Sequence, residues 1–371
     1  MSEPIRILHV VQRMEAAGIQ SFIMNMYRKI NREKVQFDFL VHYTTPQFFD
    51  EEIEELGGKI YRLSFREDYN IIKYYKELNK FFKEHNEYKV IHGHMHTLGG
   101  IYFHVAKKNN IPIRIAHAHT SGIQNNSKKY VKKIMNKFFP KDANILLACS
   151  QKAGEYMFGD LCFEVINNAI VLDNFIFSQN IRDKIRKELN LNDKFVIGNV
   201  GRMEIEKNQK LSIEIFENIH KKYPNSILLL VGTGSMFDEI KKIVEEKNLE
   251  NCVLLLGNRK DVSELYQAMD VFLMPSLYEG LGIVCVEAQA SGTPVVCTSN
   301  LPKELNITPL IYRVSLNDSL EKWVNEIEQA YNNEHKHSDM KEEIIRANYD
   351  MVNLAKKMQN FYIEKSKIFN K

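Results

Sequence analysis

Short apolar runs alternate with amphipathic stretches along the whole chain, and the runs fall into two series. The runs of the first series, each predicted to be a strand, span 5–11, 37–41, 89–92, 113–117 and 145–148. Those of the second series span 195–200, 227–231, 253–256, 271–274 and 294–297. Runs this short, apolar at successive positions, are typical of strands that a parallel sheet buries on both faces.

The stretches between the runs have the period of amphipathic helices. In the helix predicted over 20–30, Phe22, Met26 and Ile30 are spaced four residues apart and therefore share one face. The other helices predicted in this way span 70–85, 127–139, 179–189, 208–222, 235–248, 261–268 and 281–291. Strands that alternate with helices predict an α/β fold built from doubly wound parallel sheets.

The length of the chain favours two such sheets. A chain of 371 residues is longer than a single hydrophobic core usually supports, and this length suits two domains of about 150–200 residues each. We expect a Rossmann-like domain over 1–165, a linker over 166–193 and a second Rossmann-like domain over 194–339. A last amphipathic helix, over about 340–371, is expected to pack back toward the first domain. Two such domains would bind a ligand in the cleft between the carboxyl ends of their strands.

Composition excludes several classes of protein. The chain has 50 Lys and Arg against 47 Asp and Glu, so its net charge of +3 disfavours a nucleic-acid binder that depends on bulk positive charge. It contains no run of about 18 apolar residues and no signal-peptide pattern at its start, so we expect a cytoplasmic protein. The five cysteines include no C-x-x-C pair and predict buried, reduced thiols.

The strongest chemical motif is the stretch 274–288, MPSLYEGLGIVCVEA, which joins a strand end to a helix start. Gly280 and Gly282 would let the backbone approach a ligand closely, and the free N–H groups of the helix start would suit an anion. Glu279 lies in the loop, and Glu287 lies further along the helix. A carboxylate accepts two hydrogen bonds, which suits the vicinal diol of a ribose. Taken alone, the stretch is equally consistent with an ordinary helix start that carries exposed charges.

A second loop of the same domain follows the strand predicted at 195–200. It contains Arg202 and Lys207, and two cations beside a helix N-terminus would hold a diphosphate. A solvated basic loop is the alternative interpretation of this segment. The turn Gly232-Thr233-Gly234 is a weaker candidate, equally consistent with a plain tight turn.

Histidines gather at two predicted strand ends of the first domain, namely His92, His94, His96, His117 and His119. Spacing of two would permit a zinc site, but no carboxylate or cysteine stands at a ligand spacing beside them, so we predict no metal. We expect polar side chains that line the cleft. His119, just past its strand, is the one expected to contact the substrate. No D-x-D pair occurs either, so cations and helix dipoles are expected to neutralise a diphosphate.

These motifs resemble those of the retaining GT-B glycosyltransferases of family 4, in particular its capsular, exopolysaccharide and lipopolysaccharide members. The resemblance covers essentially the whole chain and rests on Ala17–Gln20, Asn167–Ile170, Gly201-Arg202, Lys207-Asn208, Pro275-Ser276, Glu279-Gly280, Glu287-Ala288 and 290–295. It implies two Rossmann-like domains that face each other across a cleft. It also implies metal-independent, retaining transfer of a hexose or N-acetylhexosamine from a nucleotide diphosphate sugar, with UDP the expected nucleotide. The implied acceptor is a saccharide, which we expect to be lipid-linked.

The resemblance also implies a role for each site residue. The implied catalytic set is His119, Arg202, Lys207 and Glu279. The implied donor-binding set is Gly18, Arg202, Lys207, Arg259, Gly280, Leu281, Gly282, Ile283 and Glu287. Within these sets Glu287 would hold the ribose, Glu279 the hydroxyls of the transferred sugar, and Arg202 with Lys207 the diphosphate. His119 would touch the donor sugar near the reacting carbon.

The implied mechanism stabilises the leaving diphosphate by cations and helix N-termini, and an oxygen of that leaving group takes the acceptor proton. Two other classes of function stay open. One is another GT-B enzyme, a phosphorylase or a nucleotide-sugar epimerase. The other is a non-catalytic protein that binds a nucleotide sugar.

The helix predicted over 127–139 combines an apolar face with many lysines. Residues 101–152 hold ten basic residues and one acidic residue. The lysines of the predicted helix are Lys128, Lys129, Lys132, Lys133 and Lys137, and its apolar face consists of Val131, Ile134, Met135 and Phe138. Either this helix packs on its sheet with a solvated lysine face, or the lysines meet anionic lipid. Our hypothesis is peripheral contact with the inner face of the cell membrane.

Overall fold

The computed structural model describes residues 3–15, 18–120 and 134–368, and the chain divides into two compact units. Unit 1 comprises residues 1–169 together with 351–371, and unit 2 comprises residues 170–350. Residues 170–193, expected to form most of a linker, are thus part of unit 2. Each unit has one parallel sheet, so the two predicted Rossmann-like sheets are confirmed.

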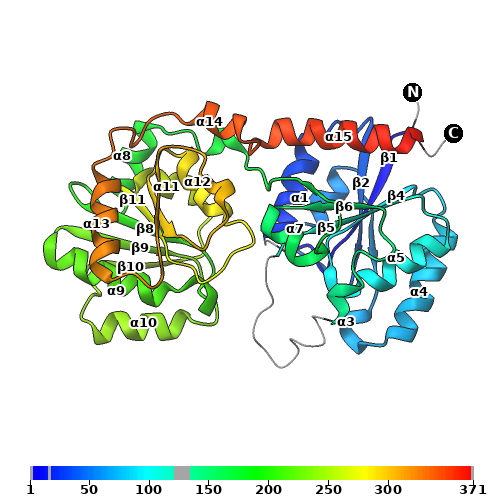
Figure 1. Cartoon of the computed structure of the whole chain (residues 1–371), viewed down its shortest axis with the longest axis horizontal. Coiled ribbons are helices and arrows are strands. Elements are labelled where there is room, and N and C mark those ends of the chain that lie inside the picture. The colour runs from blue at the N-terminus through cyan, green and yellow to red at the C-terminus, as the bar shows by residue number, and fades with distance from the viewer. Residues whose placement is uncertain (1–2, 16–17, 121–133, 369–371) are drawn as a thin grey trace. The chain divides into compact units, whose positions relative to one another are not determined.

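In its described part, unit 1 contains a seven-stranded parallel sheet in the order β3-β2-β1-β4-β5-β6-β7 (Figure 1). Its strands are β1 (Ile5–Val10), β2 (Val35–Val41), β3 (Ile60–Arg62), β4 (Val90–Gly93), β5 (Ile113–Ala118), β6 (Ile145–Ala148) and β7 (Glu164–Val165). Its helices include α1 (Gly18–Lys29), α2 (Asp50–Glu55), α3 (Phe65–Asp68), α4 (Ile71–Glu84), α5 (Gly99–Lys108) and α7 (Gln151–Phe158). The strand order reverses between β1 and β4, and ligands of open α/β sheets bind at the carboxyl end of such a switch point.

The described part of unit 2 repeats this plan with a six-stranded parallel sheet in the order β10-β9-β8-β11-β12-β13. Its strands are β8 (Phe195–Val200), β9 (Ser226–Val231), β10 (Val253–Gly257), β11 (Val271–Met274), β12 (Val295–Thr298) and β13 (Ile311–Val314). Its helices include α8 (Gln179–Glu188), α9 (Gln209–Lys222), α10 (Phe237–Glu246), α11 (Val262–Ala268), α12 (Ile283–Ala290), α13 (Leu320–Tyr331) and α14 (Lys341–Arg346). Here the switch point lies between β8 and β11.

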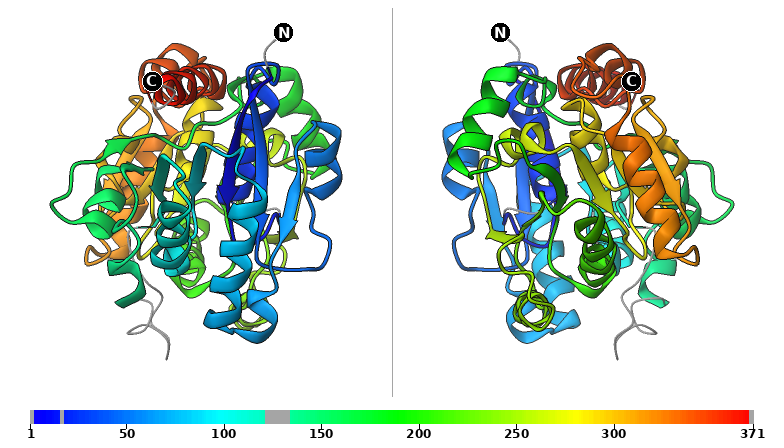
Figure 2. Two further views of the ribbon diagram at one scale, coloured as in Figure 1. Left: turned by 90° about the vertical axis from the view of Figure 1, so that its right-hand side faces the viewer. Right: turned by 90° about the vertical axis from the view of Figure 1, so that its left-hand side faces the viewer.

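The end of the chain forms two helices, although the sequence pattern predicted one over about 340–371. After α14 the chain turns at Asn348, whose φ of +62° breaks the helical path. Helix α15 (Met351–Ile368) then packs on α1, β1 and β2 of unit 1 (Figures 1 and 2). The amide Oε1 of Gln359 accepts a 2.9 Å hydrogen bond from the backbone N–H of Asn31, which ties α15 to the end of α1.

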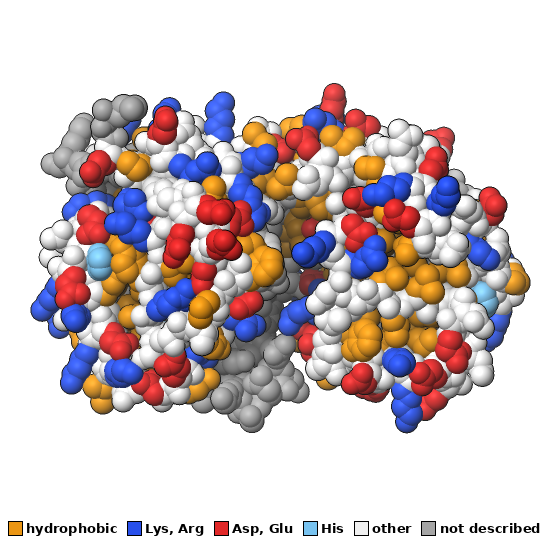
Figure 3. All heavy atoms as spheres, turned by 180° about the vertical axis from the view of Figure 1, so that it is seen from behind, with side chains coloured by type: hydrophobic (Ala, Val, Ile, Leu, Met, Phe, Trp, Pro, Cys, Tyr) orange, Lys and Arg blue, Asp and Glu red, His pale blue; other side chains and the backbone are white. Residues whose placement is uncertain are grey.

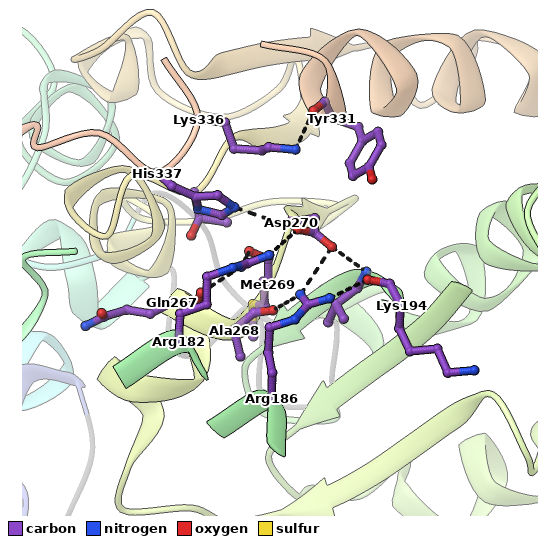
Figure 4. Close-up of polar contacts among 12 residues, drawn as sticks. Arg182, Arg186, Lys194, Gln267, Ala268, Met269, Asp270, Tyr331, Lys336 and His337 are labelled. Carbon is purple, nitrogen blue, oxygen red and sulfur yellow. Dashed lines mark hydrogen bonds and ion pairs between the residues drawn. The ribbon is translucent and has the colours of Figure 1, made fainter. Parts of the chain in front are cut away.

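A buried ion cluster fixes α8 to the sheet of unit 2 (Figure 4). The carboxylate of Asp270 accepts hydrogen bonds from Arg182 (2.6 Å), Arg186 (3.4 Å) and the backbone N–H of Val196 (2.8 Å). Burial alone would raise the pKa of Asp270, but His337, whose Nε2 lies 3.7 Å from the carboxylate, the two guanidinium charges and the backbone N–H of Val196 hold this pKa below its usual range. The cluster explains why α8 is part of unit 2.

The five cysteines are free thiols, and Cys149, Cys252, Cys285 and Cys297 are buried as predicted. Cys162 is exposed, so the prediction of burial was wrong for this residue. It lies in the irregular segment between α7 and β7, where its side chain is outside the core.

On the face of the molecule drawn in Figure 3, acidic and basic side chains are interspersed over both units. In the part of the chain that the structure describes, no helix has both the length and the apolar character needed to cross a bilayer.

Candidate active site

The two charged loops predicted from sequence meet at the switch point of unit 2. Lys207 Nζ lies 2.5 Å from Glu279 Oε1, and both side chains are largely buried. Two further hydrogen bonds join the loops: the backbone N–H of Leu277 donates to the carbonyl of Glu206 (2.8 Å), and Asn208 Nδ2 donates to the carbonyl of Pro275 (3.1 Å). Residues that are 72 positions apart therefore form one site.

The glycine turn at the start of α12 requires a left-handed backbone. Gly282 has a φ of +87° and is the N-cap residue of α12, where no described side chain caps the helix. An added Cβ would meet its nearest atoms at 3.5–3.8 Å, so backbone conformation and not crowding is the reason for glycine here. Leu281 is buried, and its side chain anchors the turn. The backbone N–H groups of Ile283 and Val284 stand in the first turn of the helix, where groups of this kind bind anions.

Glu287 lies one turn further along α12 and is held by a tyrosine that the sequence analysis did not single out. The hydroxyl of Tyr266, at the end of α11, donates a 2.8 Å hydrogen bond to Glu287 Oε2. Burial raises the pKa of the Glu287 carboxyl, and this hydrogen bond works in the opposite direction. The site thus contains two carboxylates in different settings, one beside a lysine and one beside a buried phenol.

Arg202 differs from Lys207 in its surroundings. Its side chain is 69% exposed, and its guanidinium lies 3.7 Å from Glu206. The adjacent turn contains Gly232, where an added Cβ would lie 2.1 Å from the carbonyl oxygen of Gly201. Close packing against the Arg202 loop therefore accounts for Gly232, the weaker of the sequence candidates.

Arg259 follows β10 at the same edge of the sheet. Its guanidinium makes a two-pronged ion pair with Asp261, at 2.5 and 2.8 Å, and this partner raises the pKa of Arg259. The ion pair with Asp261 therefore fixes the orientation of the Arg259 side chain.

In unit 1, His119 lies just past β5 and is half-buried. Its Nε2 is 2.9 Å from His94 Nδ1, and its backbone N–H donates to His96 Nε2 at 3.4 Å. Most of the other clustered histidines do not behave as expected. His92, His94 and His117 were expected to line the cleft, but they are buried in unit 1, with exposed fractions of 1%, 4% and 0%, so their side chains do not reach a surface.

The rings of these histidines contact one another across neighbouring strands. His9 from β1 joins them, with its Nδ1 3.0 Å from His94 Nε2, and this residue carries no sequence signal because its partner is 85 positions away. In two overlapping groups, His9–His92–His94 and His94–His117–His119, one ring nitrogen from each residue lies within 4.8 Å of those of the others. Neutral imidazoles at such distances are chemically able to bind a transition metal, which leaves the prediction of no metal untested.

Gly18 is the first residue of α1 and is exposed. An added Cβ at Gly18 would meet no atom within 4 Å, so packing within the described chain does not require glycine there.

Four of the five lysines in the predicted lipid-binding helix, Lys128, Lys129, Lys132 and Lys133, lie outside the described residues. In the described remainder, Met135 packs against the core, while Ile134 and Phe138 are 60% and 49% exposed. Lys137, between them, is exposed as well. The expected apolar face therefore does not lie wholly on the sheet.

Comparison with known proteins identifies the family to which this chain belongs. A family model described as Glycosyltransferase Family 4 matches residues 16–174, and one described as Glycosyl transferases group 1 matches residues 181–347. The putative glycosyltransferase EpsF of Bacillus subtilis is 30% identical over 88% of this chain and 87% of its own. The UDP-Gal:alpha-D-GlcNAc-diphosphoundecaprenol alpha-1,3-galactosyltransferase of Escherichia coli is 25% identical over 80% of this chain and 79% of its own.

A solved structure supports the fold assignment. The crystal structure of Anabaena Alr3699/HepE in complex with UDP and glucose matches with a TM-score of 0.79 at 17% identity, over 96% of this chain and 99% of that one. With its two parallel α/β units and the matches above, the chain belongs to the group 1, family 4 glycosyltransferases and is a glycosyltransferase of the GT-B fold.

Proposed function

We propose that this glycosyltransferase moves a hexose or N-acetylhexosamine from a UDP-linked donor to a saccharide acceptor, with retention of configuration and without a catalytic metal. One observation carries the proposal. The switch point of unit 2 combines Lys207, Glu279 and the uncapped start of α12 with the carboxylate of Glu287. These groups match the parts of a nucleotide diphosphate sugar. The lysine and the helix N-terminus suit the diphosphate, and the two carboxylates suit the hydroxyls of the sugar and of the ribose.

The leaving group determines the chemistry that these residues have to perform. When the bond between sugar and phosphate breaks, negative charge develops on the diphosphate. Lys207, Arg202 and the N–H groups of Gly282 and Ile283 supply positive charge and hydrogen-bond donors to that charge, which lowers the barrier electrostatically. An oxygen of the departing phosphate takes the proton of the acceptor hydroxyl on the same face of the sugar, so no carboxylate nucleophile is needed. Glu279, already paired with Lys207, then binds sugar hydroxyls.

The nucleotide and the acceptor are proposed from the relatives. The E. coli relative is named for a UDP-galactose donor and a diphosphoundecaprenol-linked acceptor, and the HepE structure contains UDP and glucose. A capsular polysaccharide biosynthesis glycosyltransferase of Staphylococcus aureus is also similar, at 25% identity. On this basis we propose a role in bacterial surface polysaccharide synthesis, with a lipid-linked saccharide as acceptor.

A lipid-linked acceptor requires access to the membrane surface. Exposed Ile134 and Phe138 flank Lys137, and apolar side chains beside a cation suit the interface of an anionic bilayer. The protein should sediment with vesicles that contain phosphatidylglycerol at low salt but not with purely zwitterionic vesicles. Sedimentation that is the same with both vesicles, or absent from both, would contradict the membrane contact while leaving the transfer reaction untouched.

The main experiment is a thermal-shift and transfer assay with UDP-glucose, UDP-galactose, UDP-N-acetylglucosamine and UDP-N-acetylgalactosamine. A donor that binds the native state raises the melting temperature, and the true donor should raise it most. Lys207→Ala and Glu287→Ala should each abolish that shift and the transfer. The matched control is Lys210→Ala, which removes a lysine from an exposed ion pair with Glu239 in the same unit.

The result decides between the candidate activities. Wild-type-like transfer in both site variants would overturn the site assignment. Interconversion of sugar nucleotides in the absence of any acceptor would indicate an epimerase, and binding without turnover would indicate a non-catalytic protein. Loss of transfer on addition of EDTA, restored by a divalent ion, would contradict metal independence.

A further inference from the structure

Histidine rings at the ends of two paired strands of unit 1 lie close together. His94 directly follows β4, His117 is in β5 and His119 directly follows β5. One ring nitrogen from each of these three residues lies within 4.8 Å of those of the other two. The ring centroids of His117 and His119 are 4.1 Å apart, and those of His94 and His119 are 5.1 Å apart. The pairing of β4 with β5 therefore brings together three imidazoles that are up to 25 positions apart in the sequence.

Each of the three rings has one nitrogen that a metal ion could use. His94 Nδ1 and His119 Nε2 lie 2.9 Å apart, and an ion between them would replace the hydrogen bond that joins them. His117 Nε2 is buried and has no hydrogen-bond partner in the part of the chain that the structure describes, so this nitrogen remains available. Metal–nitrogen bonds of about 2.0–2.1 Å place the ligand atoms of a tetrahedral site about 3.3 Å apart. Small rotations of the three rings would bring their nitrogens to this spacing.

The opposite nitrogens of two of these rings have the partners that metal-bound histidines require. A ligating histidine usually donates its other N–H to a neighbouring acceptor, which fixes the ring and makes the ligand more basic. His117 Nδ1 lies 3.2 Å from His92 Nε2, and His94 Nε2 lies 3.0 Å from His9 Nδ1. His92 Nδ1 in turn lies 2.8 Å from the hydroxyl of Tyr362, to which it can donate. Since a neutral ring has one N–H, this arrangement leaves a lone pair for the ion on both ligands.

The composition of the cluster favours a transition-metal ion over magnesium or calcium. Neutral imidazole binds Zn²⁺, Co²⁺, Ni²⁺ and Cu²⁺, whereas Mg²⁺ and Ca²⁺ prefer oxygen ligands. The group consists of histidines alone, so a fourth ligand has to offset the charge of the ion. His119 is half-buried, whereas His94 and His117 are only 4% and 0% exposed, so solvent can reach the ion from the side of His119. A water molecule bound to Zn²⁺ beside three histidines has a pKa of about 7 and readily becomes hydroxide.

We propose that His94, His117 and His119 form a binding site for a divalent transition-metal ion such as Zn²⁺, with a solvent molecule as the fourth ligand. His9 and His92 are positioning residues that orient two of the ligands. All five residues belong to unit 1, and the transfer chemistry proposed above uses no metal, so the ion has no step in it and the inference does not rest on it. The sequence predicted no metal because no carboxylate or cysteine stands at a ligand spacing. Three imidazoles from two paired strands complete the ligand set without either.

Cobalt(II) is a direct probe of the site, because tetrahedral Co²⁺ absorbs visible light strongly and octahedral Co²⁺ only weakly. The untagged full chain, stripped with EDTA and dialysed, is titrated with Co²⁺ at pH 7.5. We expect a tetrahedral spectrum that saturates at one ion per chain. His94→Gln and His119→Asn should each lose this spectrum. Because His119 is only half-buried, its substitution puts the fold at less risk, and circular dichroism checks the fold of both variants.

The matched control is His104→Gln, which removes another histidine of unit 1. His104 Nδ1 lies 3.0 Å from Asp142 Oδ2, and its side chain is 56% exposed, so this pair is the place where a stray ion would bind. The control should bind Co²⁺ as the wild type does. His92→Gln removes only the partner of His117 and should weaken binding about 10–100-fold without changing the spectrum. An octahedral spectrum or none in the wild type, a tetrahedral spectrum in His119→Asn, or its loss in His104→Gln would overturn the inference.

Thermal stability in the presence of Zn²⁺ gives a second readout, because an ion that binds only the native state raises the melting temperature. Zn²⁺ should stabilise the wild type and His104→Gln but not His119→Asn. Equal shifts in the wild type and His119→Asn would show that Zn²⁺ binds elsewhere and would contradict the site. Neither readout needs a sugar nucleotide, so a wild type that transfers no sugar would contradict the proposed function and leave the metal result standing.

Discussion

The hydroxyl of Tyr266 donates a 2.8 Å hydrogen bond to Oε2 of Glu287, and Tyr266 is fully buried. Because the phenol pKa is raised well above 10 by burial and by the charge of Glu287, the phenol keeps its proton and stays a donor at every pH of interest. One oxygen of the carboxylate is thereby occupied. In the proposed donor complex the other oxygen, Oε1, would accept from the ribose.

Tyr266→Phe should weaken UDP binding by about tenfold or more, because a hydrogen bond to a charged group such as a carboxylate contributes about 1.5–3 kcal/mol. The variant should also shift the pH profile. Burial raises the pKa of Glu287 and the hydrogen bond lowers it, so removing the bond raises this pKa further. Binding needs the carboxylate and fails below the pKa, so the acidic limb should move to higher pH. Calorimetric titration with UDP between pH 5 and 8 measures both effects.

The control for this variant is Tyr312→Phe. It removes a tyrosine hydroxyl that accepts a 2.7 Å hydrogen bond from Asn333 in the same unit. UDP affinity and its pH profile should stay as in the wild type. An unchanged acidic limb in Tyr266→Phe would show that Glu287 does not govern binding.

A second prediction concerns the left-handed residue at the start of α12. Gly282→Ala places a Cβ on a backbone with φ +87°, which costs about 1–2 kcal/mol of stability or forces the turn to change. A changed turn would move the N–H groups of Gly282 and Ile283 away from the phosphate that they are proposed to bind. We expect the variant to lose at least tenfold in UDP affinity, measured by calorimetry beside a thermal melt.

The matched control is Gly159→Ala, at the C-cap of α7 in unit 1. Gly159 also has a positive φ, +61°, and an added Cβ there meets nothing within 4 Å. Its ψ of −127° lies outside the left-handed helical region, so Gly159→Ala should lower the melting temperature at least as much as Gly282→Ala and leave UDP affinity intact. If both variants bound UDP equally well, the start of α12 would have no part in holding phosphate.

Much of the fold could be predicted because the strands are buried on both faces. The bounds predicted for β6, β8 and β11 agree with the structure, because an unbroken apolar run between two turns marks where a strand begins and ends. Strands β3 and β7 escaped prediction because three and two residues are too short for any period to show. The break at Asn348 was missed because the apolar pattern continues across it.

The candidate site could be predicted only where its residues share a loop with glycines. Glu279 and Gly282 stand in one motif, and Lys207 stands in another, so local sequence sufficed to find them. Tyr266 and His9 looked like ordinary core residues. Their partners come from other strands and helices, and a polar contact between distant segments leaves no periodic signal along the chain. The same limit applied to the buried histidines. Their spacing of two residues is equally typical of a strand end that is exposed to solvent, so it did not indicate burial.

Asp270→Asn tests the ion cluster that fixes α8. The two arginines next to Asp270 have side chains only 12% and 10% exposed, so removing the carboxylate leaves buried positive charge without compensation. Such a loss costs about 3–5 kcal/mol. Urea unfolding followed by the fluorescence of Trp323, the single tryptophan, which lies in unit 2, measures it. Glu239→Gln, in an exposed pair with Lys210, should cost less than about 1 kcal/mol. If Asp270→Asn and Glu239→Gln cost the same free energy of unfolding, burial would not be the reason that the Asp270 cluster stabilises unit 2.

The last prediction comes from the sign of the histidine pKa shifts in unit 1. Burial lowers the pKa of His9 and His117 to about 3 and that of His42 to about 4, while unfolded histidine titrates near 6.5. Below pH 6.5 the unfolded chain therefore binds protons that the folded unit excludes. Each such histidine removes about 1.4 kcal/mol of stability per pH unit, and this contribution is fully present only above pH 6.5.

Unit 1 should therefore unfold on mild acidification, before unit 2, because the free energy of a typical domain is only about 5–15 kcal/mol. Five buried histidines, His9, His42, His92, His94 and His117, act together in unit 1. Between pH 7 and pH 5 the far-UV circular dichroism should fall to a plateau that matches one remaining unit, while the fluorescence of Trp323 in unit 2 stays native. His42→Gln removes one of these titrating rings. After correction for any stability that the variant loses at pH 7.5, the pH midpoint of its acid unfolding should lie below that of the wild type. Simultaneous loss of both signals, or native dichroism at pH 5, would contradict the assignment of neutral rings to this cluster.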